Sequence, residues 1–309
     1  MPAIQNTSTE PIAIKPTRFE VKAGKLSPQN LEIAIRALHE DGLIVVENIF
    51  DHMRLNKLNE KMVEDAYELQ ARKENSPYNY NRGNIQQDPP PVKGCFDESI
   101  FLNPIVSEIT SAHLGPAPKW TFCSANTALP PTVDSPPQSQ PIHTDADFDH
   151  HTHPFALVIN VPLVSMAPEN GATEIWLGTH KNTTVDDQVS RHGDRGSGTI
   201  KRDLLEERRK VRAPSQPSVR KGSVIIRDLR LWHGGKPNLG NEPRVMLAMI
   251  HFAPWYRNPI RLEFADDLRE TFESQTQLEI PTDWVTEAEA LKKYLERGYG
   301  NSYDFDQDP

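Results

Sequence analysis

The sequence contains three histidine–x–aspartate pairs that could each supply two ligands to a metal ion: His39–Asp41, His143–Asp145 and His192–Asp194. In a strand, residues two apart share a face, so such a pair can bind one ion from one side. The first pair ends a predicted helix, where its side chains would point about 200° apart. The third lies in a charged segment where we expect a solvated loop. His143–Asp145 follows an extended run and is the candidate pair.

A third ligand is expected at the end of a strong strand signal. Residues 223–231 read SVIIRDLRL and lead into Trp232 and His233, just before a Gly-Gly turn. Two histidines and one carboxylate on one face leave coordination positions open, which suits non-haem Fe(II) oxygen chemistry. The same ligands also occur in hydrolytic zinc sites, but the sequence has no HExxH motif. Iron is therefore expected ahead of zinc.

Arg244 opens the apolar run 245–250, eleven residues after His233. A guanidinium at the start of such a strand needs an anionic partner, because an unpaired buried charge is very costly. One possibility is a carboxylate of the chain itself, such as Glu242 or Asp228. The other is a dicarboxylic cosubstrate bound as a bidentate pair. The residues alone leave both possibilities open.

Helical patterns dominate the first part of the chain, and short apolar strands dominate from Trp120 onward. Helices are predicted over Pro28–Glu40, Arg54–Arg72 and Glu98–Leu114, with a buried strand at Leu43–Val46 and a loop at Asn75–Lys93. Further strands are predicted at Trp120–Ala128, Ile142–Asp145, Phe155–Val164, Thr173–Leu177, Ser223–Leu231 and Arg244–Phe252. This order predicts an α+β fold, mainly β, in which N-terminal helices buttress a sandwich or barrel.

We expect a single domain over residues 28–260. Residues 1–27 are predicted to form an N-terminal tail or a peripheral strand, and residues 261–309 a C-terminal helical extension with an acidic tail. The charged segment 186–220 is predicted to be a loop insertion that can act as a lid.

Composition excludes several classes of function. There are 34 Lys and Arg against 43 Asp and Glu, giving a net charge of −9 without a basic cluster, so neither nucleic acid nor a membrane is an expected partner. No apolar run approaches the roughly 18 residues of a membrane span, and the N-terminus lacks a signal-peptide core. Cys95 and Cys123 are the only cysteines, which suits a reducing compartment. We expect a cytoplasmic protein whose metal is bound by histidine and carboxylate.

Three motifs in this order resemble the phytanoyl-CoA dioxygenase (PhyH) superfamily. They are His143–Thr–Asp145, the segment 169–173 (ENGAT) leading into 177–180 (LGTH), and 227–233 (RDLRLWH) followed by Arg244. The resemblance covers about residues 31–256. It is strongest to the fungal secondary-metabolism branch, which includes the fumitremorgin endoperoxygenase and the quinolone-forming dioxygenases. It implies a double-stranded β-helix (jelly-roll) core, Fe(II), 2-oxoglutarate and O2 as cosubstrates, and a homodimer.

The resemblance also implies roles for individual residues. The iron ligands would be His143, Asp145 and His233, and Arg244 would bind the distal carboxylate of 2-oxoglutarate. Further contacts to this cosubstrate are expected from Gln140 and from one of two threonines, Thr173 or Thr179. Substrate contacts are expected from four residues: Asn84, Gln86, Phe148 and His150.

These inferences predict an Fe(II)/2-oxoglutarate-dependent dioxygenase that oxidises a small, largely apolar natural product in a biosynthetic pathway. The outcome would be hydroxylation, desaturation, epoxidation or rearrangement, with succinate and CO2 as co-products. The intact Asp145 argues against a halogenase, since those relatives lack the carboxylate ligand. The alternatives are a catalytically idle jelly-roll that binds a ligand, and a zinc hydrolase. The spacing of 90 residues between His143 and His233 is longer than expected, and we place the excess in 186–220.

Overall fold

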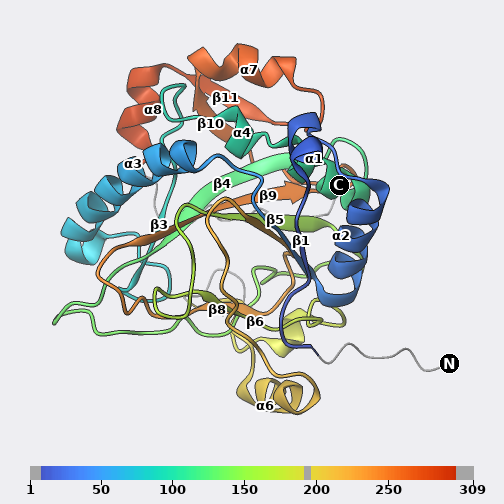
Figure 1. Ribbon diagram of the computed structural model, residues 1–309. Coiled ribbons are helices and arrows are strands. Elements are labelled where there is room, and N and C mark those ends of the chain that lie inside the picture. The colour runs from blue at the N-terminus through green and yellow to red at the C-terminus, as the bar shows by residue number, and fades with distance from the viewer. Residues whose placement is uncertain (1–7, 191–195, 297–309) are drawn as a thin grey trace.

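A seven-stranded sheet forms the centre of the computed structural model, which describes residues 8–190 and 196–296 (Figure 1). Neighbouring strands are antiparallel, except that β1 runs parallel to β2. The strands, in their order across the sheet, are β1 (Ala13–Ile14), β2 (Leu43–Val46), β7 (Val224–Asp228), β5 (Ala156–Pro162), β9 (Arg244–Phe252), β4 (Lys119–Ala128) and β3 (Asn84–Gln87).

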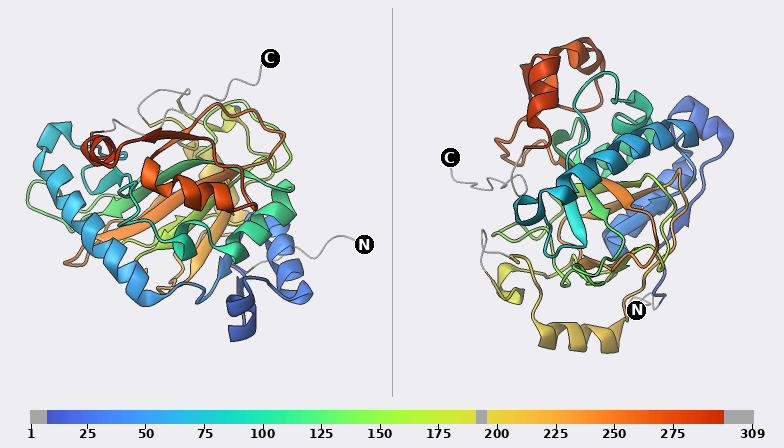
Figure 2. Two further views of the ribbon diagram at one scale, coloured as in Figure 1. Left: turned by 90° about the horizontal axis from the view of Figure 1, so that it is seen from above. Right: turned by 90° about the vertical axis from the view of Figure 1, so that its left-hand side faces the viewer.

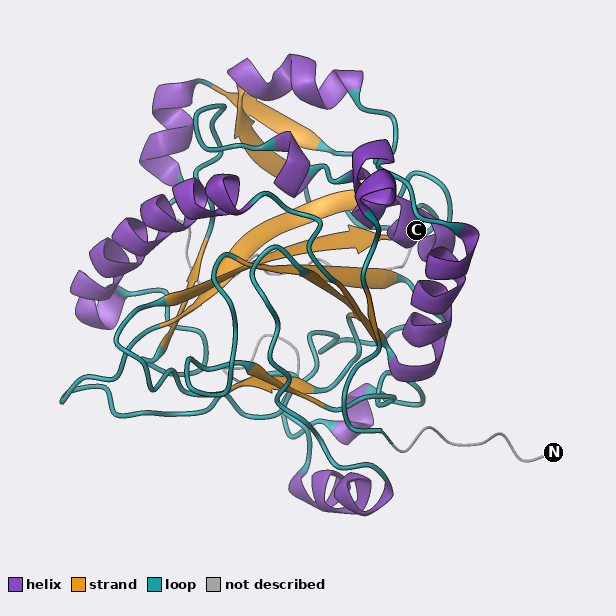
Figure 3. Cartoon of the chain, viewed as in Figure 1, coloured by secondary structure: helices purple, strands orange, loops and turns teal. Residues whose placement is uncertain are grey.

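A small second sheet lies below the large one and completes the jelly-roll (Figure 3). It pairs β6 (Thr173–Ile175) with β8 (His233–Gly235) in antiparallel fashion. Single bridges from His143 to His233 and to Thr199 widen this layer. The predicted strand Ile142–Asp145 is therefore reduced to isolated bridges. The predicted jelly-roll core with buttressing N-terminal helices is confirmed.

Alternation along the strands of the large sheet separates a core-facing row from a row that faces the small sheet. On β7, Val224 and Ile226 belong to the main hydrophobic core, whereas Ile225 and Arg227 line a cavity between the sheets. Successive side chains of a strand point to opposite faces, which explains this division. The same alternation on β9 sends four side chains into the cavity: Arg244, Met246, Ala248 and Ile250.

Three helices cover the outer face of the large sheet: α2 (Pro28–Asp41), α3 (His52–Ala71) and α5 (Pro104–Leu114) (Figure 2). The predicted start and end of α2 are confirmed, since the Ser27 side chain accepts from the Asn30 amide and Gly42 ends the helix in the left-handed conformation. These helices join the core strands in one hydrophobic cluster, which holds the large sheet in place behind the cavity.

Two further predicted elements differ from the structure. The helix predicted over Glu98–Leu114 is two helices, α4 (Glu98–Phe101) and α5, because Asn103 caps a new start directly before Pro104. The loop predicted over Asn75–Lys93 contains β3, an edge strand paired with β4. Its sequence, NIQQ, shows no apolar alternation, so pairing with β4 rather than local pattern forms this strand.

The outer segments contain more regular structure than the sequence indicated. Helix α1 (Arg18–Ala23) follows β1, and α6 (Arg202–Val211) lies within the charged segment 186–220 (Figure 1). After residue 260, a parallel pair packs with two helices at the top of the molecule: β10 (Leu262–Ala265), β11 (Thr282–Val285), α7 (Arg269–Ser274) and α8 (Glu287–Lys293). None of the helices in the described residues is long and apolar enough to span a membrane.

Candidate active site

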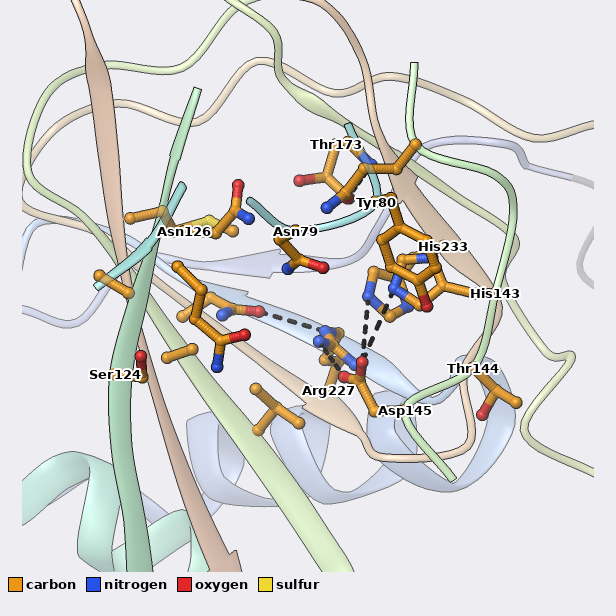
Figure 4. A pocket seen from close by; sticks show the side chains of 18 of the residues that line it. Asn79, Tyr80, Ser124, Asn126, His143, Thr144, Asp145, Thr173, Arg227 and His233 are labelled. Carbon is orange, nitrogen blue, oxygen red and sulfur yellow. Dashed lines mark hydrogen bonds and ion pairs between the residues drawn. The ribbon is translucent and has the colours of Figure 1, made fainter. Parts of the chain in front are cut away.

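His143, Asp145 and His233 meet at the edge of the cavity between the two sheets (Figure 4). One potential ligand atom of each residue lies within 4.8 Å of the others. Asp145 Oδ1 is 3.7 Å from His143 Nε2 and 3.8 Å from His233 Nε2. The bridge between His143 and His233 sets the two imidazoles side by side, with ring centroids 4.3 Å apart. Within the described ranges, no other cluster of three or more metal-ligating side chains is present.

Backbone carbonyls fix the tautomer of both histidines. His143 Nδ1 is 2.9 Å from the Pro141 carbonyl, and His233 Nδ1 is 2.9 Å from the Leu231 carbonyl. A carbonyl only accepts, so both Nδ1 atoms carry the proton and both Nε2 atoms keep a lone pair toward Asp145. The pKa of each imidazole is lowered, above all by burial. Both histidines are therefore neutral at neutral pH, as metal binding requires.

Asp145 is ionised, and Arg227 is the main reason. Burial acts to raise the pKa of this carboxyl group, but the positive charge and the hydrogen bond of Arg227, the strongest opposing interaction, hold the pKa well below its usual range. Arg227 Nη2 donates to Asp145 Oδ2 over 2.6 Å. Two neutral imidazoles and one carboxylate that open onto a cavity are a ligand set suited to Fe(II) with vacant positions.

The cavity has a volume of about 640 Å³ and extends from these three residues between the sheets. Apolar side chains from the large sheet form much of its wall: Phe122, Val158, Ile225, Met246 and Ile250. Polar side chains interrupt this wall, among them Asn79, Gln86 and Asn126. Figure 4 shows Asn79 and Asn126 beside this space, with Arg227 and Asp145 across from them. The cavity can therefore accept a molecule that is partly apolar and also forms hydrogen bonds.

Arg244 lies in the wall of the same cavity and is 1% exposed. Its Nη2 donates to the Gly171 carbonyl over 2.7 Å and its Nη1 to the Asn126 carbonyl over 3.4 Å, while Nε is buried without a partner. Burial lowers its pKa to about 10, which still leaves it charged. In the part of the chain that the structure describes, no carboxylate forms an ion pair with it, so this cation fits an anionic ligand.

The structure distinguishes the two threonines. Thr173 lines the cavity. Thr179 is buried outside it, where its hydroxyl donates to the Trp176 carbonyl over 2.7 Å and accepts from the Trp232 amide over 2.9 Å. Gln140 lines the cavity too, and its Oε1 accepts from the Gly235 amide over 2.8 Å. Thr173 and Gln140, but not Thr179, are therefore brought together with Arg244.

Only one of the four residues expected to contact substrate lies in the cavity wall. This residue is Gln86. Asn84 is buried on β3 outside the cavity lining, and Phe148 packs in the main core. His150 stacks on Phe155, with ring centroids 5.7 Å apart. Since β3 is a strand, Asn84 and Gln86 share a face, but only the second reaches the space between the sheets.

Of the remaining histidine–x–aspartate pairs, His39–Asp41 does not form a site. His39 is exposed at the end of α2, and Asp41 is buried and paired with Arg212 Nη1 over 2.5 Å. The third pair, His192–Asp194, lies outside the described residues.

Two residues in the cavity wall escaped the sequence reasoning. Tyr80 lies over His143 with ring centroids 4.6 Å apart, and its hydroxyl donates to the Ser197 carbonyl. Nothing in its loop sequence indicates this contact. Arg227 could have been found, because it interrupts the apolar strand SVIIRDL just as Arg244 opens another.

The solved structures that share this fold include two of the same enzyme. One is the non-heme alpha ketoglutarate dependent epimerase SnoN from nogalamycin biosynthesis, at 17% identity over 73% of this chain and 83% of that chain, with a TM-score of 0.51. The other is SnoN in complex with Fe3+, alpha ketoglutarate and nogalamycin RO, at 17% identity over 73% of this chain and 84% of that chain, with a TM-score of 0.56. At this identity, the likeness establishes the fold.

The sequence model of Phytanoyl-CoA dioxygenase (PhyH) matches residues 38–246. The match spans more than half of the chain and includes His143, Asp145, His233 and Arg244. The donor set suits Fe(II), and the buried Arg244 suits a carboxylate of 2-oxoglutarate. The chain therefore belongs to the phytanoyl-CoA dioxygenase (PhyH) family and is an Fe(II)/2-oxoglutarate-dependent oxygenase.

Proposed function

We propose that this enzyme oxidises a small natural product in a biosynthetic pathway, with succinate and CO2 as co-products. The observation that carries the proposal is that one cavity contains both the His143–Asp145–His233 cluster and the charged Arg244, with space left for a further molecule. The reaction is one of hydroxylation, desaturation, epoxidation or rearrangement of a substrate C–H or C=C group.

In this proposal, His143, Asp145 and His233 bind Fe(II). The bound metal supplies O2 activation coupled to oxidative decarboxylation of 2-oxoglutarate. Arg244 binds the distal carboxylate of 2-oxoglutarate by charge-assisted hydrogen bonds, with Gln140 and Thr173 beside it. Tyr80, which covers His143 and bonds to Ser197, excludes water from this end of the cavity.

The cavity wall indicates the chemical character of the substrate. Its apolar side chains pack against a largely apolar molecular frame. Asn126 Nδ2 is buried without a partner, and Asn79 and Gln86 lie in the same cavity wall, so neutral hydrogen-bonding groups on the substrate would be recognised there. We therefore propose a substrate with an apolar skeleton and a few carbonyl, amide or hydroxyl groups.

The fungal secondary-metabolism branch and a cytoplasmic location stay predictions, as does the homodimer, for which light scattering in solution is the direct test. A mass near 35 kDa would exclude the dimer. Family membership weighs against a zinc hydrolase, and the buried Arg244 weighs against an idle binding protein, which has no need of a cosubstrate carboxylate partner.

The proposed site is tested by adding Fe(II) and 2-oxoglutarate to the metal-free protein without oxygen and recording the visible charge-transfer band of the chelate. The wild-type protein should show the band, while Asp145→Ala and Arg244→Ala should show none or require much more 2-oxoglutarate. A folded wild-type protein without a band would contradict the proposed site. A positive result justifies a screen of terpenoid, alkaloid and peptide-derived compounds for substrate-dependent succinate formation.

A further inference from the structure

Arg227 is a buried cation that the family assignment leaves without a role. It stands on β7, near the middle of the large sheet, and is 6% exposed. Its Nη2 donates to Asp145 Oδ2 over 2.6 Å (Figure 4). Its Nε donates to Asn160 Oδ1 over 3.1 Å. Asn160, on the adjacent strand β5, donates in turn to the Leu247 carbonyl of β9 over 3.2 Å. Arg227 is thus tied to three neighbouring strands of the sheet.

Asp145 has no such anchorage in regular structure. It lies in a bend after the two isolated bridges at His143, outside both sheets. Its two oxygens have different surroundings. Oδ2 accepts from Arg227, whereas Oδ1 is the atom that lies 3.7 and 3.8 Å from the two imidazole Nε2 atoms. The guanidinium therefore determines which carboxylate oxygen faces the histidines.

We propose that Arg227, braced by Asn160, is the positioning residue that makes Asp145 a ligand through one oxygen only. With Oδ2 hydrogen-bonded to the guanidinium, Oδ1 alone would face a bound metal, and the carboxylate would supply one donor atom rather than two. Space beside the metal would then remain for the 2-oxo acid. The inference rests on the proposed ligand roles of His143, Asp145 and His233.

A purely electrostatic role of Arg227 explains this geometry less well than a positioning role does. A cation close to a metal site repels the metal, so a charge that keeps Asp145 ionised does not by itself account for the two directed hydrogen bonds of Arg227. The planar guanidinium instead bonds a carboxylate on one edge and an amide on another, which fixes the orientation of both. Partners that orient metal ligands typically change metal affinity by about 10- to 100-fold when they are replaced.

The test compares Arg227→Lys with the wild-type protein by titration with Mn(II) in the absence of 2-oxoglutarate, where the EPR signal of free Mn(II) reports binding. Lysine keeps the positive charge, but its single ammonium group cannot bond Asp145 and Asn160 in the same geometry. We expect Mn(II) affinity to fall by about 10- to 100-fold. Arg244→Lys is the matched control, because it changes a buried arginine of the same cavity that does not touch Asp145, and its Mn(II) affinity should equal that of the wild type.

Each outcome decides the inference. Equal Mn(II) affinity of Arg227→Lys and wild type would overturn the positioning role while leaving the proposed function intact. Failure of the wild-type protein itself to bind Mn(II) would overturn the ligand assignment and the inference with it. Should Arg227→Lys not fold by circular dichroism, Asn160→Ala decides, because it keeps Arg227 and removes only its brace. A several-fold loss of Mn(II) affinity in Asn160→Ala supports the role, and an unchanged affinity refutes it.

Discussion

The segment 227–230 contributes to two arginine–aspartate pairs, which are built differently. Arg230 binds both oxygens of Asp228 through Nε and Nη2, at 2.8 and 2.7 Å, and its own backbone amide donates to the same carboxylate. Both side chains of this pair are 2% exposed. Arg227 binds only one oxygen of Asp145, whose side chain is 26% exposed at the cavity. One carboxylate is saturated by protein donors and the other is half open.

The difference separates a structural ion pair from a ligand. A buried charge is tolerated where its hydrogen-bonding capacity is satisfied, which Arg230 achieves for Asp228 with three donors. Asp145 is satisfied on one side, while its Oδ1 points to two imidazole lone pairs that cannot donate to it. That arrangement is incomplete until a cation lies between the three side chains. The carboxylate whose hydrogen-bonding capacity is only partly filled, Asp145, is therefore the one at the candidate metal site.

The largest effect is expected at the histidines that face the partly open carboxylate of Asp145. His143→Ala and His233→Ala should each abolish 2-oxoglutarate-dependent succinate formation, because each removes one ligand from a three-ligand site, while circular dichroism shows a retained fold. The assay is succinate release with Fe(II) and O2 present. Near-normal activity in both variants would show that Asp145 does not belong to a metal site, and the distinction between a ligand and a structural carboxylate would be lost.

The saturated pair should instead govern stability. Arg230→Met leaves the carboxylate of Asp228 buried and uncompensated, so we expect the free energy of unfolding to fall by about 3–5 kcal/mol. Arg227→Met should cost less, because Asp145 is partly exposed and retains solvation. Urea denaturation of the two variants measures this contrast. Equal losses would show that the two pairs contribute alike to the fold.

Arg244 sharpens the comparison, since it has carbonyl partners but no carboxylate among the described residues. Arg244→Ala should chiefly raise the concentration of 2-oxoglutarate needed for turnover, because about 2–5 kcal/mol of charge pairing with the cosubstrate is lost. The measurement is the apparent KM for 2-oxoglutarate, with Mn(II) affinity in its absence as the control. An unchanged requirement for 2-oxoglutarate would exclude Arg244 as its carboxylate partner.

Local patterns explain why the sequence predicted much of this architecture. The N-cap at Ser27, the terminal Gly42 and the apolar run after Arg244 each signal an element within a few residues, and α2 and β9 follow them closely. The three candidate ligands were likewise identified from a short motif and a strand end. Strand β3 was not identified, because polar residues at a sheet edge give no such signal.

Contacts between distant segments were beyond this reasoning. Arg227 and Asp145 lie 82 residues apart, and their contact depends on how β7 is placed relative to a loop. The choice between Thr173 and Thr179 likewise depends on which threonine faces the space between the sheets, although both stand near one predicted strand. Strand register and the packing between the two sheets determine both contacts. Neither is visible in a short stretch of one sequence.

His251 is a buried titratable group without a charged partner among the described residues, and it should make stability depend on pH. Burial lowers its pKa to about 3, and no carboxylate is involved. Because its folded pKa lies below the usual 6.5, the unfolded chain takes up a proton first as the pH falls, and stability is lost from about pH 6.5 down to about pH 3. At pH 5 this histidine should cost about 2 kcal/mol relative to neutral pH. His251→Gln should flatten the dependence of unfolding free energy on pH in this range, and an unchanged slope would contradict a neutral buried His251.

Modest effects of different kinds are expected for the two threonines, because Thr173 lines the cavity and Thr179 does not. Thr179 forms two buried hydrogen bonds with backbone groups, so Thr179→Val should lower the free energy of unfolding by about 1–3 kcal/mol and leave the KM for 2-oxoglutarate unchanged. Thr173 faces the cavity, so Thr173→Val should raise that KM modestly and change stability little. Urea denaturation and steady-state kinetics on the two isosteric variants give both quantities. The reverse pattern would show that Thr179 contacts the cosubstrate, and that satisfied hydrogen bonds do not mark structural residues in this protein.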